Sequence, residues 1–68
     1  MIEIKIDTEF IRLDALMKLS GLASMGGEAK HFIQDGLVKL NGVTCTERSK
    51  KIRPGDAIEF SRQQVKVV

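Results

Sequence analysis

An Asn-Gly pair at residues 41 and 42, in the stretch GLVKLNGVTC, restricts the fold of this chain more than any other feature. A two-residue type I′ turn needs positive φ at both central positions, and Asn-Gly meets this requirement well. Apolar and polar residues alternate around the pair, with Val38 and Leu40 before it and Val43 after it. The sequence therefore predicts a β-hairpin that turns at Asn41-Gly42.

A first helix is expected well ahead of this hairpin. Its apolar residues recur at the spacing of one helical face: Phe10, Leu13, Leu16 and Met17. Gly21 follows as a C-terminal signal, because glycine readily takes the left-handed conformation that ends helices. The N-cap is ambiguous between Asp7 and Thr8, both of which can accept a hydrogen bond from the first turn.

A second helix is expected from Gly27 to Asp35, with Gly36 closing it. Its inward-facing residues are predicted to be Ala29, Phe32 and Ile33, and its outward-facing residues Lys30, His31 and Gln34. The connection to the first helix is short, so the two helices should pack together as a pair.

The remaining segments read as strands and turns. Residues 2–6, IEIKI, alternate with period two, as do the segments around Ile58 and Val65. Residues 48–53, RSKKIR, form a basic loop at the far end of the same sheet, with Ile52 as an anchor in the core. Residues 53–56, RPGD, match a type II turn. The fold class is therefore α+β, with two helices on a small, largely antiparallel sheet.

The size and cysteine content exclude several classes of protein. With 68 residues the chain is expected to be one domain, residues 1–68. A single cysteine cannot form an internal disulfide, which excludes a small disulfide-stapled scaffold. No apolar run approaches the ~20 residues that span a bilayer, and the N-terminus has no signal-peptide pattern. We therefore expect a monomer in the cytoplasm, away from membranes.

Few residues suggest catalysis or metal binding. One Cys and one His cannot supply a four-ligand metal site, so His31 is expected on the surface and Cys45 as a small buried apolar residue. No acidic pair suggests acid–base chemistry, so we expect no enzyme and no cofactor. Gly26 and Gly27 leave two alternatives open: plain turn chemistry, or a phosphate site made of backbone amides at a helix start.

The charge is unevenly distributed along the chain. Residues 1–35 carry four basic and six acidic side chains, whereas residues 36–68 carry seven basic and three acidic ones. A concentration of positive charge suggests an anionic partner. The chain has three Phe and no Trp or Tyr, so extended stacking of single-stranded bases is not expected.

These parts resemble, in their order, the S-four-type RNA-binding domain named after a small-subunit ribosomal protein. The resemblance covers about residues 10–60: Arg12-Leu13-Asp14 at the first helix, Ala29 with Phe32-Ile33 in the second, the run from Gly36 to Gly42, and Gly55-Asp56 before a strand. It implies an αL motif, in which two helices and a hairpin form an L. The chain is most similar in kind to free-standing small bacterial members that associate with ribosomes. One departure is that Met25-Gly26 stands where the family often has Ser-Arg, and that Arg commonly contacts RNA.

The expected function is recognition of structured RNA, above all ribosomal RNA, by a basic surface of the second helix and the hairpin. Lys39 is expected beside Lys30 on this surface. The expected RNA-binding residues are Arg12, Lys30, Gln34, Lys39, Asn41, Arg48, Lys50, Lys51 and Arg53, with Gly26 and Gly27 as a backbone phosphate site. Asn41 is equally explained by its turn. Lys18 and Lys66 are expected to be as readily solvated bystanders as contacts. The alternative function is that of a protein–protein adaptor on the ribosome or an assembly factor.

Overall fold

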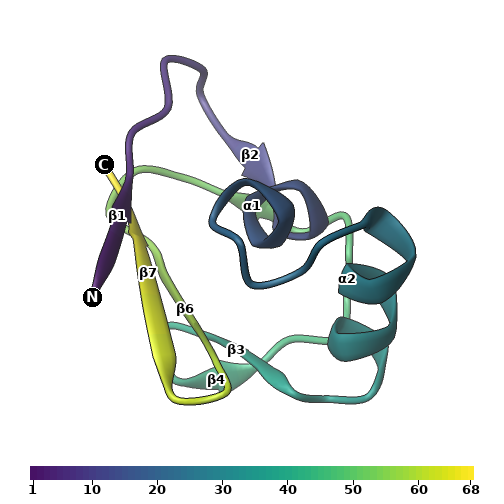
Figure 1. Cartoon of the computed structure of the whole chain (residues 1–68). Coiled ribbons are helices and arrows are strands. Elements are labelled where there is room, and N and C mark those ends of the chain that lie inside the picture. Colours follow the sequence, from purple (N-terminus) through teal and green to yellow (C-terminus); the bar gives the residue numbers. More distant parts are fainter.

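Two helices cover one face of a small sheet in the computed structural model, which describes all residues 1–68 (Figure 1). Five strands form the main sheet in the order β1-β7-β6-β3-β4, and β2 and β5 form a separate two-stranded sheet. Only β1 and β7 run parallel, which confirms the α+β class with a largely antiparallel sheet. The elements are β1 (Ile2–Ile4), β2 (Ile11–Arg12), α1 (Leu13–Leu19), α2 (Gly26–Gln34), β3 (Val38–Leu40), β4 (Val43–Thr44), β5 (Lys51–Ile52), β6 (Ala57–Phe60) and β7 (Gln63–Val67).

Helix α1 begins later than its apolar pattern predicts. Its N-cap is Arg12, which makes no side-chain capping bond, so the predicted caps Asp7 and Thr8 are wrong. The first N–H groups of the helix donate instead to carbonyls of the basic loop, Leu13 N to Lys50 O at 2.9 Å and Asp14 N to Arg48 O at 3.1 Å. A distant segment therefore satisfies donors that a local side chain usually satisfies.

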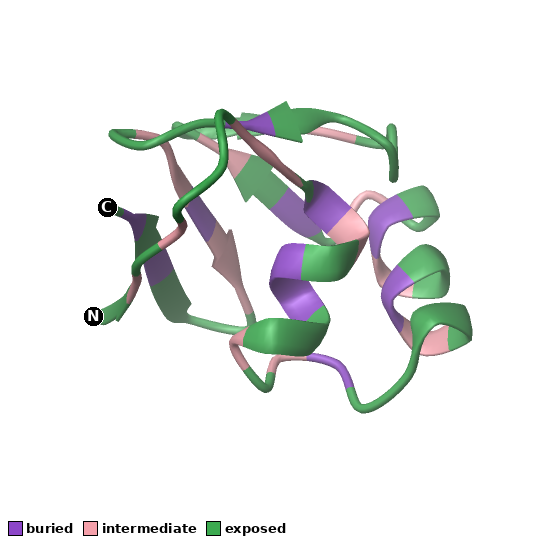
Figure 2. Cartoon of the chain, turned by 90° about the horizontal axis from the view of Figure 1, so that it is seen from above, coloured by how far each residue is buried: buried purple, intermediate pink, exposed green.

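The end of α1 and the whole of α2 agree with the sequence pattern. Gly21 takes φ +82° directly after α1, and Gly36 takes φ +76° directly after α2, as C-terminal glycines do. Helix α2 spans Gly26–Gln34, one residue earlier at each end than expected. The outward residues of α2 are exposed, as expected, and its inward residues are buried or half-buried (Figure 2): outward Lys30, His31 and Gln34; inward Ala29, Phe32 and Ile33.

The β3–β4 hairpin turns as its Asn-Gly pair predicts. Asn41 has φ 50° and Gly42 has φ 87°, the two positive values of a type I′ turn. The Asn41 side chain also ties the turn to the next segment, because its Oδ1 accepts the Ala57 N–H at 2.9 Å and its Nδ2 donates to Asp56 Oδ1 at 3.0 Å. The turn is therefore held by a tertiary contact as well as by its own conformation.

The basic loop, residues 48–53, does not lie at the far end of the main sheet, and that expectation is wrong. Lys51 and Ile52 form β5, which pairs antiparallel with Arg12 and Ile11 of β2. Ile52 is fully buried, as expected of an anchor. The type II turn at residues 53–56 is confirmed by Gly55 at φ +100° and by the Asp56 N–H donating to Arg53 O at 2.9 Å.

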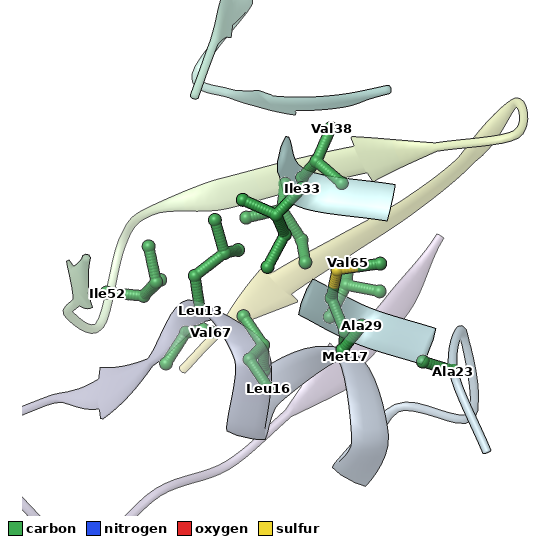
Figure 3. Packing of buried hydrophobic residues seen from close by; sticks show 11 residues of the cluster. Leu13, Leu16, Met17, Ala23, Ala29, Ile33, Val38, Ile52, Val65 and Val67 are labelled. Atoms are coloured by element: carbon green, nitrogen blue, oxygen red, sulfur yellow. The ribbon is translucent and has the colours of Figure 1, made fainter. Parts of the chain in front are cut away.

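The core lies between the helices and the inner face of the sheet, the face turned toward α1 and α2 (Figure 3). Both helices and four strands contribute fully buried side chains: Leu13, Leu16, Met17, Ala29, Ile33, Val38, Ile52, Ile58, Val65 and Val67. Cys45 packs against this core but is only half-buried, so its predicted burial is met in part. No helix combines the length and the apolar character needed to cross a membrane.

The turn between β6 and β7 is strained. Ser61 and Arg62 have φ 53° and 65°, so a second type I′-like turn forms without the Asn or Gly that such turns favour. Sequence reasoning missed it for that reason. Left-handed backbone costs an L-residue other than glycine roughly 1–2 kcal/mol.

Replacing Arg62 by glycine should therefore raise the free energy of unfolding by about 0.5–1 kcal/mol. The gain is smaller than the backbone strain that is removed, because glycine also has more conformational entropy in the unfolded chain. Urea denaturation would measure the difference. Arg62→Ala is the control, because alanine removes the same charge and keeps the strain. Equal stabilisation by both variants would show that the gain comes from charge and not from backbone relief.

Candidate nucleic-acid interface

Cations from two separate segments meet at the start of α1. The two backbone bonds from Leu13 and Asp14 hold the basic loop against the first turn of the helix, and Arg12 lies opposite Lys51 in the β2–β5 pair. Figure 1 shows the chain after β4 passing beside this end of α1. Arg12, Arg48, Lys50 and Lys51 are thereby brought together, and all four side chains are exposed.

Arg12 is the only cation of the chain in an ion pair. Its Nη2 donates to Asp14 Oδ2 at 3.0 Å, while Asp14 Oδ1 accepts the Ala15 N–H at 2.8 Å. The Arg12 side chain remains 49% exposed although the Asp14 side chain is only 18% exposed. A guanidinium has five N–H donors, so one bond to Asp14 orients the group and leaves donors free for an anion.

Lys51 is oriented by an aromatic ring. Its Nζ lies 4.9 Å from the centroid of the Phe10 ring, within the range of a cation–π interaction. Phe10 therefore does not belong to the α1 stripe as its spacing suggested, but supports a lysine beside the basic loop.

A shallow cleft of ≈ 260 Å³ continues from Arg12 between α1 and the start of α2. We call it the basic cleft; it is lined by Arg12, Asp14, Ala15, Lys18 and Gly26. The sequence left Lys18 open between a solvated bystander and a contact, and the structure places it in one cleft with Arg12. The helical spacing could have predicted this neighbourhood. Residues 14 and 18 lie on one helical face at i, i+4, and Arg12 directly precedes that helix.

Gly26 and Gly27 are the first two residues of α2, and neither has a positive φ. A Cβ added at either position would meet no atom within 4 Å. Neither a positive φ nor a nearby atom therefore requires glycine at these two positions. Because glycine has no side chain, the backbone at the start of α2 is left uncovered. Glu28 places a carboxylate nearby, where its Oε1 accepts the Ser24 N–H at 3.0 Å, so the positive end of α2 is partly offset.

Other predicted site residues lie apart from this cluster. Lys39 is paired across the sheet with Glu59 and Thr44, on the outer face, the face turned away from the helices. Lys30 lies on the exposed side of α2, so the structure does not bring these two lysines onto one surface. Asn41 uses both ends of its amide within the protein, which favours the structural explanation of this residue. Gln34 is exposed and does not line the basic cleft. Arg53 is the last residue of the basic loop and is exposed at the start of the turn that Asp56 holds.

Asp56 fastens the turn that follows the basic loop. Its carboxylate accepts the Arg53 N–H at 2.8 Å and the Asn41 amide at 3.0 Å. The Arg53 N–H first, and then the Asn41 side chain, hold the pKa of Asp56 below its ordinary value, against a smaller opposing effect of burial.

This lowered pKa predicts a pH dependence of stability. Because the folded pKa lies below the unfolded one, the contribution is complete above about pH 3.9, the unfolded value of an aspartate, and is lost as the pH falls through the folded pKa. Asp56→Asn should therefore be less stable than the natural chain at pH 7, and the difference should shrink in strong acid. Thermal melts from pH 7 to pH 2 would measure it, and a constant difference would contradict the assignment.

These features define a class of protein: a small α+β domain in which a helix pair and a hairpin surround a cationic surface, with no cluster of side chains placed to hold a metal ion. Comparison with known families gives the same result. Residues 4–68 match the model of the S4 domain, and the chain belongs to this family.

Similar proteins agree on the fold. The chain is 38% identical over 57 residues to the "Probable ribosome maturation protein RlbA" of Bacillus subtilis (strain 168), covering 84% of this chain and 80% of that protein. It is 36% identical over 58 residues to YbcJ of Escherichia coli (strain K12), covering 85% and 83%. The solution structure of YbcJ superposes with a TM-score of 0.77 at 32% identity, over 100% of this chain and 87% of that one, and was described as revealing an αL motif involved in RNA binding. The expected αL fold is confirmed.

Proposed function

We propose that this chain binds structured RNA, with ribosomal RNA as its natural ligand, through the basic cleft and the basic loop. The observation that carries the proposal is the meeting of Arg12 with three cations of the basic loop at the start of α1. The basic cleft extends this surface from Arg12 to Lys18 in the last turn of the helix. Apart from Arg12, these cations have no carboxylate partner. Such a surface gains from phosphate groups, which also release bound counterions when lysine and arginine neutralise them.

The aromatic residues support recognition of backbone and shape over stacking of bases. Phe32 and Phe60 stack on each other with centroids 4.5 Å apart, and Phe10 lies under Lys51. All three phenylalanines are therefore engaged within the protein. Stacking of bases on aromatic rings is therefore not available, and contacts to phosphates and to the shape of a folded RNA are the main mode of binding on this surface. The uncovered backbone of Gly26, at the end of the basic cleft, would add N–H donors for one phosphate.

Similarity supports the ligand class. The family and the αL motif of YbcJ point to RNA, and the name of the Bacillus subtilis relative points to the ribosome. On this proposal the chain works in the cytoplasm as a monomer and needs no catalytic group.

Crosslinking in cells, followed by sequencing of the attached RNA, tests the proposal. We expect ribosomal RNA fragments to be enriched, and the enrichment to fall when Arg12 and Lys18 are replaced by glutamine. Association with ribosomal particles should also be lost after nuclease treatment. Association that survives nuclease, with no crosslinked RNA, would instead show an adaptor that binds a ribosomal protein.

A further inference from the structure

A second hollow borders the basic loop and shares no lining residue with the basic cleft. It is a groove of ≈ 380 Å³ between the β3–β4 hairpin and the segment that follows β4. Its apolar side is formed by Leu40, Val43 and Cys45, and its rim by Glu47, Lys50 and two threonines. We call it the hairpin groove. Lys50 belongs both to this rim and to the basic loop, so the groove continues the surface proposed to hold the RNA backbone.

The apolar side of the hairpin groove is left uncovered by the fold. Val43 is 69% exposed, although Leu40 and Cys45 beside it pack against the core. Cys45 Sγ lies 3.8 Å from Glu47 O, which holds the rim against the apolar side. Single exposed valines are common and need no explanation. Val43 differs from such isolated valines because it lines a hollow together with other apolar side chains, and charged groups lie at the edge of that hollow.

The two charged residues of the rim are complementary to different chemical groups. Lys50 has no acidic partner and suits a phosphate, whereas the unpaired Glu47 carboxylate repels phosphate and accepts hydrogen bonds from amino groups. A nucleotide carries both: a phosphate and, in cytosine, adenine and guanine but not in uracil, an exocyclic amino group that carboxylates can recognise. The faces of its base are apolar, matching Leu40 and Val43. The groove is at the small end of ligand pockets, roughly 300–1,000 Å³. Only seven residues line it, whereas a standard protein–protein interface takes roughly 20–30 residues from each partner.

We propose that the hairpin groove receives one unpaired, amino-bearing nucleobase of the RNA whose backbone lies on the basic loop. This inference rests on the proposed function and extends it: the preferred ligand is a helix interrupted by one bulged nucleotide whose base carries an amino group, with cytidine as the test case. Unpaired bases are accessible to side chains in a way that the deep groove of an RNA helix is not.

The single cysteine of the chain supplies a direct probe, since Cys45 lines the groove. Its rate of alkylation by iodoacetamide would be measured alone, with an RNA hairpin carrying one bulged cytidine, and with the same hairpin lacking the bulge. At saturation, we expect only the bulged RNA to slow alkylation strongly. The bulged RNA should also bind roughly five- to tenfold more tightly than the unbulged one, the lower end of the range for a single good base contact.

Two variants separate the groove from the basic loop. Val43→Gln should keep the fold, because the side chain is exposed, and should abolish the preference for the bulge while leaving affinity for the unbulged RNA unchanged. Glu47→Ala should erase a preference for bulged cytidine over bulged uridine, which lacks the amino group.

Equal binding of the bulged and unbulged RNAs, or equal protection of Cys45 by both, would overturn the inference while leaving the proposed function intact. Protection of Cys45 by a ribosomal protein after nuclease treatment, but not by bulged RNA, would assign the groove to a protein partner. If neither RNA binds at all, the proposed function fails and this inference fails with it.

Discussion

Replacing both Arg48 and Lys50 by glutamine is expected to weaken binding of every structured RNA by a similar factor, on the order of 10–100-fold at 0.1 M salt. Each lost phosphate contact should flatten the plot of log affinity against log salt by roughly 0.7–0.9, so the double variant should lose about 1.4–1.8 from the slope. The factor should be similar across sequences because phosphate contacts position a protein without reading bases. Titration of ribosomal RNA fragments at several salt concentrations would measure both quantities.

Arg48 and Lys50 are a better pair for this test than the two adjacent lysines of the loop. Lys51 also contacts the Phe10 ring, so its replacement changes the local packing as well as the charge. Only the backbone carbonyls of Arg48 and Lys50 bond to α1, and a side-chain substitution keeps those bonds. The melting temperature of the double variant should therefore barely move.

A matched control distinguishes a specific surface from general attraction between opposite charges. Lys39 and Lys66 are exposed on β3 and β7, and Lys39 is paired with Glu59 on the outer face of the sheet. Replacing both by glutamine removes the same charge at a place far from the basic loop in the fold. Equal losses in the two double variants would mean that net charge alone drives binding. Unchanged affinity and slope in the Arg48 and Lys50 variant would remove the basic loop from the interface.

Replacing Leu16 by alanine is expected to lower the free energy of unfolding by about 2–5 kcal/mol. Leu16 is fully buried between α1 and the inner face of the sheet (Figure 3), so the truncated side chain leaves a cavity that a close-packed core cannot fill. At roughly 0.05–0.15 kcal/mol per residue, a chain of this length has only about 3–10 kcal/mol of stability. The variant should thus lose a large share of it, which urea denaturation would measure.

Leu19 provides the internal control, since it lies on the same helix but is 59% exposed. Leu19→Ala should change the free energy of unfolding by no more than about 0.5 kcal/mol. If the two variants unfold at the same urea concentration, the packing of α1 against the sheet does not stabilise the domain as the structure indicates.

The sequence by itself determined those features that are encoded by neighbouring residues. Local φ values determine the Asn41-Gly42 turn, the ends of both helices and the turn at residues 53–56. Glycine, asparagine and proline have characteristic φ preferences, so these features can be predicted from the sequence. The apolar faces of α1 and α2 follow from helical spacing, so their buried residues could be predicted as well. The motifs that begin with Arg12-Leu13-Asp14 were enough to indicate the S4 family, because they keep their order and spacing along the chain.

Tertiary structure alone decided the features that depend on contacts between distant segments. Helix α1 starts at Leu13 because carbonyls of Lys50 and Arg48 accept its first N–H groups, and no local signal reveals a partner more than thirty residues away. The same contact carries the basic loop to Arg12, whereas strand pairing turns Lys39 to the outer face of the sheet. The closure of β6 on β7 drives Ser61 and Arg62 into left-handed backbone that their own preferences oppose. Charge could be counted from the sequence, but its gathering into one surface required the fold, because pairing and packing decide which side chains become neighbours.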